Sequence, residues 1–80
     1  VLEYIEFSDT HAIVEVAVPQ RWVGKSLAEL NVRKKYGVTV LAVSDPKTGM
    51  NISPDPSKPF SADETVALLG EMAAIDRMTK

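Results

Sequence analysis

Residues 37–54, GVTVLAVSDPKTGMNISP, decide the fold of this chain. The run 38–43 is almost entirely apolar and rich in β-branched residues, which predicts a strand buried on both faces. Residues 45–49 predict a turn, because Pro46 fixes φ near the value that a turn needs and Gly49 tolerates a positive φ. The strand and the turn together predict a hairpin that starts from a buried strand.

The chain returns from this turn as a short strand at residues 50–52. Pro54 has no N–H to donate, so it ends the pairing or confines its position to a sheet edge. The returning edge strand therefore presents Asn51, Ile52 and Pro54. We expect the functional site at this edge.

Two further strands are predicted at the start of the sequence. Residues 2–7 mix aromatic, β-branched and acidic side chains, and residues 12–18 alternate so that one face carries valines (Val14, Val16 and Val18). The short polar connection between them favours an antiparallel hairpin. His11 in this connection is expected to be a solvated loop residue, and a ligand role is the alternative.

Residues 26–36 predict a helix. Ser26 and Glu29 match a capping box, in which the Ser hydroxyl accepts from a free N–H of the first turn and Glu29 reaches back to the Ser26 N–H. Gly37 ends the helix. Its apolar positions predict the buried side: Leu27, Leu30 and Val32.

The basic triplet Arg33-Lys34-Lys35 falls in the last turn of this helix. Cations there complement the partial negative charge of the helix C-terminus. The preferred interpretation is that these cations complement the helix dipole and keep the surface soluble. The alternative is that they bind an anion. Trp22, the single Trp, is expected to plug the core or a domain interface rather than to stack on a ligand.

The strand, helix and strand that span residues 12–43 would form a βαβ unit with a right-handed crossover if both strands belong to one sheet. A loop stiffened by prolines follows at residues 55–59, with Phe60 as the anchor of its far end. Residues 65–69 predict another buried strand, which Gly70 ends.

Residues 73–78 predict a closing helix with Ile75 and Met78 toward the core. The predicted order is strand–strand–helix–strand–strand–strand–helix. We therefore expect an α+β fold, a small sandwich in which helices pack on a mixed sheet.

The length, net charge and hydropathy of the chain limit the classes of protein to which it can belong. The chain has 80 residues, so residues 1–80 are expected to form one domain with a small core. The net charge of −2 argues against a nucleic-acid partner, and no apolar run approaches the ~20 residues of a membrane span. No signal peptide is visible. The sequence opens without Met in an expected strand, so we interpret it as a domain excised from a longer protein.

Catalytic and metal-binding constellations are not found in the sequence. There is no Cys, and the single His11 cannot supply a site with several His ligands. Asp63 and Glu64 are adjacent, so on a strand they would face opposite ways and could not act as a carboxylate pair. No G-x-S-x-G, G-x-G-x-x-G or P-loop motif occurs. We expect no enzyme and no cofactor.

Several segments in this order resemble the C-terminal RCK domain, also called TrkA-C. The most specific are VP (18–19), WVGKSL (22–27), LN (30–31), RKKYGV (33–38) and NISP (51–54). Each is weak alone, but their order and spacing make the resemblance specific, and it covers nearly the whole chain. Where this family usually has Gly-Asp before the last strand, this sequence has Asp63-Glu64. The loop 45–49 is also longer than in many members.

The resemblance implies a regulatory ligand-binding domain of a potassium or other cation transport system. It implies a homodimer, attached through its N-terminal side to a Rossmann-like RCK domain and acting with a membrane transporter subunit. The expected location is the cytoplasm, peripheral to the transporter or as its cytoplasmic part, without insertion into the membrane.

The resemblance also implies a ligand, cyclic di-AMP, in a cleft at the dimer interface. The positions that match the family's binding residues are Val40 and Leu41 on the buried strand and Asn51, Ile52 and Pro54 on the return strand. Asp45 and Lys47 are candidates for a polar contact in the longer loop. A purine base needs apolar contacts on its faces and hydrogen bonds on its edge, and the Asn51 amide offers both a donor and an acceptor.

Two other functions stay open at this point. The domain could be a structural dimerisation module with an empty pocket, which titration with cyclic di-AMP would distinguish. It could also sense another small molecule in a different class of transporter, which the flanking sequence would settle.

Overall fold

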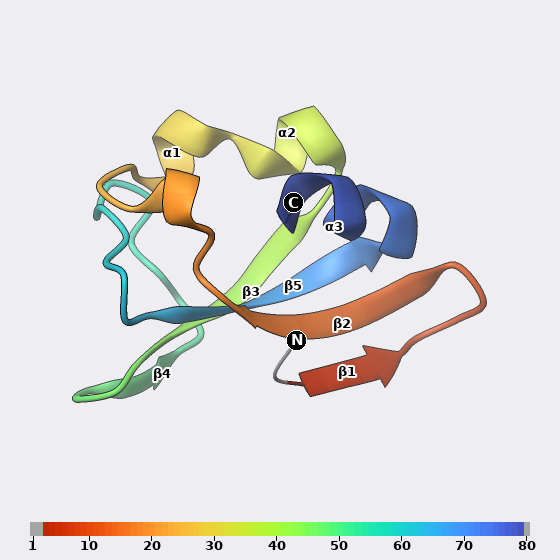
Figure 1. Ribbon diagram of the computed structural model, residues 1–80, viewed down its shortest axis with the longest axis horizontal. Helices are drawn as coiled ribbons and strands as arrows, with labels where there is room; N and C mark the ends of the chain where they lie inside the picture. The colour runs from red at the N-terminus through yellow and green to blue at the C-terminus, as the bar shows by residue number, and fades with distance from the viewer. Residues whose placement is uncertain (1–2, 80) are drawn as a thin grey trace.

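Five strands form one sheet in the order β1-β2-β5-β3-β4, and the helices pack on one of its faces (Figure 1). The computed structural model describes residues 3–79. The strands are β1 (Glu3–Glu6), β2 (His11–Ala17), β3 (Thr39–Asp45), β4 (Gly49–Asn51) and β5 (Thr65–Glu71). The helical elements are the 3₁₀ turn η1 (Gln20–Trp22) and the helices α1 (Leu27–Leu30), α2 (Val32–Tyr36) and α3 (Met72–Thr79).

The predicted α+β class and the predicted order of elements are confirmed, but the mixed sheet is not. Every neighbouring pair of strands in the sheet is antiparallel. β2 and β3 run in the same direction, as a crossover connection requires, but β5 lies between them and pairs with both. β5 takes this central place because its alternate side chains, Val66, Leu68 and Gly70, are all buried. The two parallel strands of the expected βαβ unit are therefore not neighbours, because β5 lies between them.

Several boundaries differ from the prediction. β1 ends at Glu6, so Phe7 lies beyond the strand that was predicted to include it, and Leu2 lies outside the described residues. His11 is the first residue of β2 rather than a loop residue, and its Nδ1 lies 2.8 Å from Oγ1 of Thr10. β4 ends at Asn51, so Ile52 follows the strand instead of belonging to it.

Gly70 does not end β5, which continues to Glu71. Its role is close packing, because a Cβ at this position would lie 3.1 Å from Cγ2 of Val38. The residue that was interpreted as a stop signal instead lets two backbones approach.

The predicted helix 26–36 is broken at Asn31, which adopts a left-handed conformation with φ 50°. Its N–H donates to the carbonyl of Leu27 and closes α1, and α2 starts at the next residue. Asn tolerates this conformation better than most residues, since its short polar side chain can bond locally. Gly37, with φ 70°, ends α2 as predicted.

The capping box is confirmed. The Ser26 hydroxyl accepts from the Glu29 N–H at 3.3 Å, and Oε1 of Glu29 accepts from the Ser26 N–H at 3.0 Å. Ser26 is buried, so these polar groups have no ready replacement by water.

Replacement of Ser26 by Ala should therefore lower the free energy of unfolding by ~1 kcal/mol, the usual loss for a helix N-cap. Urea denaturation followed by circular dichroism measures this loss. Ser26→Thr keeps a hydroxyl and is the matched control, with a smaller loss. A Ser26→Ala domain as stable as the parent would show that the box contributes nothing.

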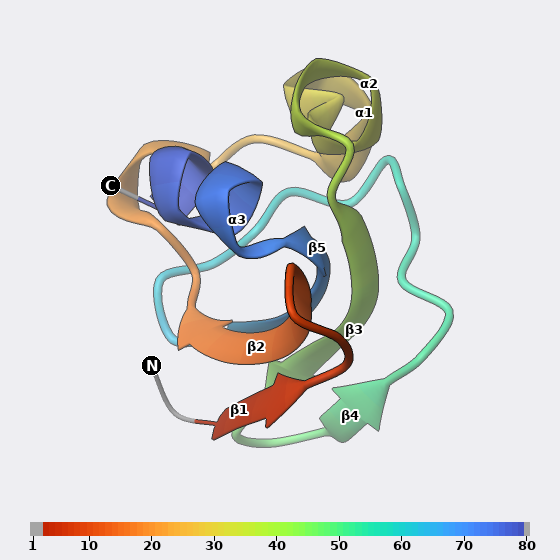
Figure 2. The same cartoon turned by 90° about the vertical axis from the view of Figure 1, so that its right-hand side faces the viewer.

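The core lies between the sheet and the helices. α2 contacts β3, and α3 contacts both β5 and α2 (Figure 2). Trp22 is 1% exposed, and its ring centroid lies 5.4 Å from that of Phe60, so the predicted core plug is confirmed. Ile75 and Met78 on α3 are buried, as predicted.

No helix among residues 3–79 covers the opposite face of the sheet. Tyr4, Val14 and Leu68 stand opposite one another on the helical side, so the alternating residues Ile5, Ile13 and Leu69 share the other face. On that face Ile5 is 53% exposed. β3 is consequently not buried on both faces as predicted, since its residues range from exposed at the N-terminal end to buried in the middle.

Candidate functional site

The β3–β4 hairpin is held by its own turn. Oδ1 of Asp45 accepts from the backbone N–H groups of Lys47 at 2.7 Å and Thr48 at 3.3 Å. Gly49 then adopts a φ of 85° and starts β4. Asp45, a predicted polar contact, thus uses one carboxylate oxygen to fix the loop.

A β-bulge lies in the predicted apolar pair of β3. Val40 pairs with Leu68, but the next partner of β5, Ala67, pairs with Ala42, so that Leu41 is the extra residue. A bulge bends the strand and changes the direction of its side chains. Both Val40 and Leu41 are half-buried. No Gly marks this position, so the sequence carried no signal for it.

The segment 51–54 leaves the hairpin at the edge of the sheet. Oδ1 of Asn51 accepts from the Ser53 N–H at 2.9 Å, which folds the chain back after β4. Nδ2 of Asn51 donates to no group among residues 3–79. Ile52 is 76% exposed and Pro54 is half-buried. This edge of the sheet therefore presents an amide donor, Nδ2 of Asn51, next to the exposed apolar side chain of Ile52.

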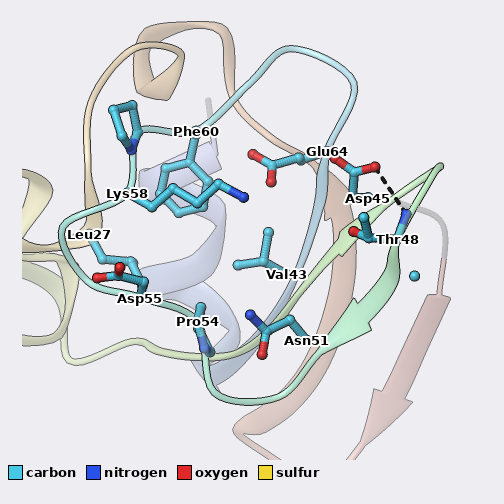
Figure 3. A pocket seen from close by; sticks show the side chains of 12 residues that line it. Leu27, Val43, Asp45, Thr48, Asn51, Pro54, Asp55, Lys58, Phe60 and Glu64 are labelled. Carbon is cyan, nitrogen blue, oxygen red and sulfur yellow. Dashed lines mark hydrogen bonds between the residues drawn. The ribbon is translucent and has the colours of Figure 1, made fainter.

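A cavity of about 60 Å³ lies between this hairpin and the loop that ends at Phe60 (Figure 3). Asp45, Asn51 and Pro54 line it from the hairpin side. Small-molecule pockets measure ~300–1,000 Å³, so this space holds a few waters and no nucleotide base.

The predicted site residues do not meet in one cavity of a single chain. Val40 lines a separate cleft of about 300 Å³ between β3, the α1–α2 segment and Pro56. Leu41 and Ile52 line neither space. The structure thus brings Asp45, Asn51 and Pro54 together and leaves Val40, Leu41 and Ile52 apart from them.

Three acidic residues line the small cavity, which the sequence did not predict. Glu64 is 5% exposed, and its Oε1 accepts from the Ser61 N–H at 2.7 Å. Asp45 and Asp55 also line the cavity, and among residues 3–79 Lys58 is its one basic residue. The carboxylates would repel a phosphate placed inside. No group of acidic or His residues within residues 3–79 has the arrangement of a metal site.

Asp55 is fixed as an anion by its own loop. The Ser57 hydroxyl donates to it at 2.7 Å, and with the Ser57 N–H and the nearby Lys58 it lowers the pKa of the Asp55 carboxyl. A carboxyl whose pKa is lowered in the folded state stabilises the fold at pH values above its unfolded pKa. This stabilisation is lost as the pH falls through the folded-state pKa. We therefore expect this carboxylate to stabilise the folded loop at neutral pH and to lose that effect in acid.

Large exposed apolar side chains flank the hairpin. Met50 is 63% exposed and lies next to Asn51, whose other neighbour is the exposed Ile52. Apolar side chains gathered at a sheet edge are typical of contact surfaces. Separately, no helix within residues 3–79 has the length and apolar character of a membrane span.

The family model of the TrkA-C domain matches residues 11–80. The chain belongs to the TrkA-C domain family. This membership confirms the resemblance based on the WVGKSL and NISP segments. The match begins at β2, so β1 lies outside the family model.

Two potassium uptake proteins of Bacillus subtilis (strain 168) are similar to this TrkA-C domain. Ktr system potassium uptake protein C is 30% identical over 80 residues, covering all of this chain and 36% of the relative. Ktr system potassium uptake protein A is 35% identical over 77 residues, covering 96% of this chain and 34% of the relative. The chain thus spans about a third of each relative.

Solved structures share the fold. The RCK C domain of the potassium transport protein KtrA, in complex with cyclic diadenosine monophosphate (c-di-AMP), superposes with a TM-score of 0.80 and 27% identity over 89% of this chain and 82% of that one. The RCK_C domain dimer of S. agalactiae BusR in complex with c-di-AMP gives a TM-score of 0.69 and 26% identity over 82% and 83%.

Proposed function

We propose that this TrkA-C domain is a regulatory domain of a potassium transport system and binds cyclic di-AMP across a two-fold dimer. The observation that carries the proposal is the likeness to the KtrA domain, whose structure holds this ligand. The domain would act in the cytoplasm without catalysing a reaction. Its partners would be a preceding RCK domain and a membrane transporter subunit.

The geometry of the hairpin supports a site that needs two copies. The cavity inside one chain is too small for a base, while Met50 and Ile52 are exposed at the edge. A two-fold dimer presents each of these residues twice, and cyclic di-AMP carries two identical adenines. We therefore place the ligand outside the small cavity, between the exposed edges of two subunits.

Each predicted site residue has a role in this proposal. Val40, Leu41, Ile52 and Pro54 supply apolar contacts to the adenine faces. Asn51 holds the loop through Oδ1 and donates to the base edge through Nδ2, which is free for a ligand. Asp45 acts mainly by fixing the turn.

Replacement of Asn51 by Ala should weaken the binding of cyclic di-AMP by ~1–3 kcal/mol, because a polar group of the ligand loses its partner. Isothermal titration of the parent and the variant measures the loss. Asn51→Asp keeps an oxygen for the Ser53 N–H but has no amide donor, so it should also bind more weakly. The absence of binding heat for the parent at millimolar ligand, or parental affinity in Asn51→Ala, would refute the proposed site.

A dimerisation module without ligand is the second candidate, and the exposed Ile5 and Met50 favour it independently of any ligand. Sedimentation and titration together separate the two functions. A dimer that takes up no cyclic di-AMP would support the module, whereas a monomer at high micromolar concentration would exclude both.

A further inference from the structure

The basic residues of the chain are concentrated around α1 and α2. Five of the nine Lys and Arg residues lie between positions 21 and 35: Arg21, Lys25, Arg33, Lys34 and Lys35. Glu29 is the one acidic residue in this segment, and its carboxylate accepts hydrogen bonds from Ser26. The surface formed by this segment therefore carries five cations and one carboxylate, although the whole chain has a net charge of −2.

A cleft of about 180 Å³ opens on this surface between η1 and the two short helices. Lys25 comes from the loop before α1, and Lys35 comes from α2. Arg21 also lines the cleft, and no acidic residue does. Its apolar part consists of Leu30 and Tyr36, which are half-buried, and of Trp22 and Val32, which are buried.

The helix dipole accounts for Arg33, Lys34 and Lys35, which lie in the last turn of α2, but not for the whole arrangement. α2 has five residues, and three of them are cations. Lys25 lies outside any helix and cannot serve a dipole. The fold thus collects cations from two separate segments around one depression.

We propose that this cleft docks an acidic segment of a partner polypeptide, with carboxylates against Lys25 and Lys35 and an apolar side chain over Leu30 and Tyr36. The inference is independent of the proposed ligand site. Like charges gathered at one face attract a partner of opposite charge and speed its encounter. The mixed lining suits a segment in which acidic and apolar residues alternate.

Other occupants fit this surface less well. The cleft is smaller than the ~300 Å³ at which small-molecule pockets begin, so a nucleotide does not enter it. A membrane-binding surface would need exposed large apolar side chains beside the cations. In the described part of the chain these side chains (Tyr4, Ile5, Phe7, Met50 and Ile52) all lie on other elements. The acidic excess outside this face also disfavours a nucleic acid.

The proposal is tested by adding a synthetic peptide of Glu-Glu-Leu repeats to the ¹⁵N-labelled chain at low salt. The amide signals of Lys25, Leu30, Lys35 and Tyr36 should shift in proportion to bound peptide. Raising the salt to ~0.3 M should weaken binding severalfold, because exposed charges are then screened. The double variant Lys25→Gln/Lys35→Gln should bind about fivefold more weakly, consistent with two exposed ion pairs.

The matched control is Lys47→Gln/Lys58→Gln, which removes the same charge elsewhere and should bind like the parent. Both double variants replace exposed side chains, and their amide spectra report that the fold is kept. The proposal fails if the peptide shifts no signals of this face or if both double variants bind equally. It also fails if phosphatidylglycerol vesicles, duplex DNA or inorganic phosphate shift these signals at lower concentrations than the peptide.

Discussion

The domain with Trp22 replaced by Ala should be less stable by ~3–5 kcal/mol, the range for removing a large aromatic ring from a core. Trp22 is 1% exposed and packs against Phe60. The backbone around this pair is tied by hydrogen bonds from the Gly24 N–H to the Phe60 carbonyl and from the Phe60 N–H to the Lys25 carbonyl, both 2.9 Å. The cavity left by the indole therefore cannot collapse without breaking these contacts.

Thermal and urea unfolding followed by circular dichroism measure this loss, since the variant has no Trp to report by fluorescence. Domains have a free energy of unfolding of ~5–15 kcal/mol, so a chain of this size should be partly unfolded. Trp22→Phe keeps a ring against Phe60 and should lose less. Phe7→Ala removes an aromatic ring that is 69% exposed and should change little. Equal stability of Trp22→Ala and Phe7→Ala would contradict the proposed core.

The second large effect concerns ligand binding. Ile52→Asp should weaken cyclic di-AMP binding by at least about 100-fold, or ~3 kcal/mol, because a carboxylate replaces the apolar contact of the base and lies near the phosphates. The loss should exceed that of Asn51→Ala, which removes one hydrogen bond. The fold should be kept, since the Ile52 side chain is 76% exposed and follows an edge strand.

Isothermal titration and sedimentation measure binding and dimerisation of this variant. Ile52→Val keeps the apolar contact and should bind nearly as the parent does. Phe7→Asp adds the same charge next to β1, at the opposite edge of the sheet, and should leave binding unchanged. If Ile52→Asp binds with parental affinity, then Ile52 does not contact the ligand and the site lies elsewhere.

Local features of the fold were predictable from the sequence. The capping box at Ser26, the core position of Trp22 and the hairpin turn at Gly49 each depend on a few adjacent residues. The strand order was not predictable in this way, since it depends on β5 entering between two earlier strands. The break at Asn31 was missed because neither Gly nor Pro marks it.

The candidate site was predicted in part. The sequence predicted that Asn51 and Ile52 lie on an edge strand after the turn; the structure confirms this for Asn51, whereas Ile52 follows the strand. The bulge at Leu41 was not foreseen, because register depends on the partner strand. The buried Glu64 was also missed, since nothing in its neighbourhood distinguishes a buried carboxylate from a solvated one. Ligand contacts remain predictions, because the proposed site lies between two subunits and the structure describes one chain.

The central position of β5 has a consequence for how the chain acquires its structure. Ala12 pairs with Gly70, and Val43 pairs with Val66, so the middle of the sheet is supplied by a strand that is synthesised after both of its neighbours. Until then β2 and β3 have no partner between them, and their edges are open to other chains. Pairing between strands as far apart in the sequence as β2 and β5 slows folding. Synthesis that pauses before residue 65 should therefore yield an aggregation-prone intermediate, even though the finished domain is small.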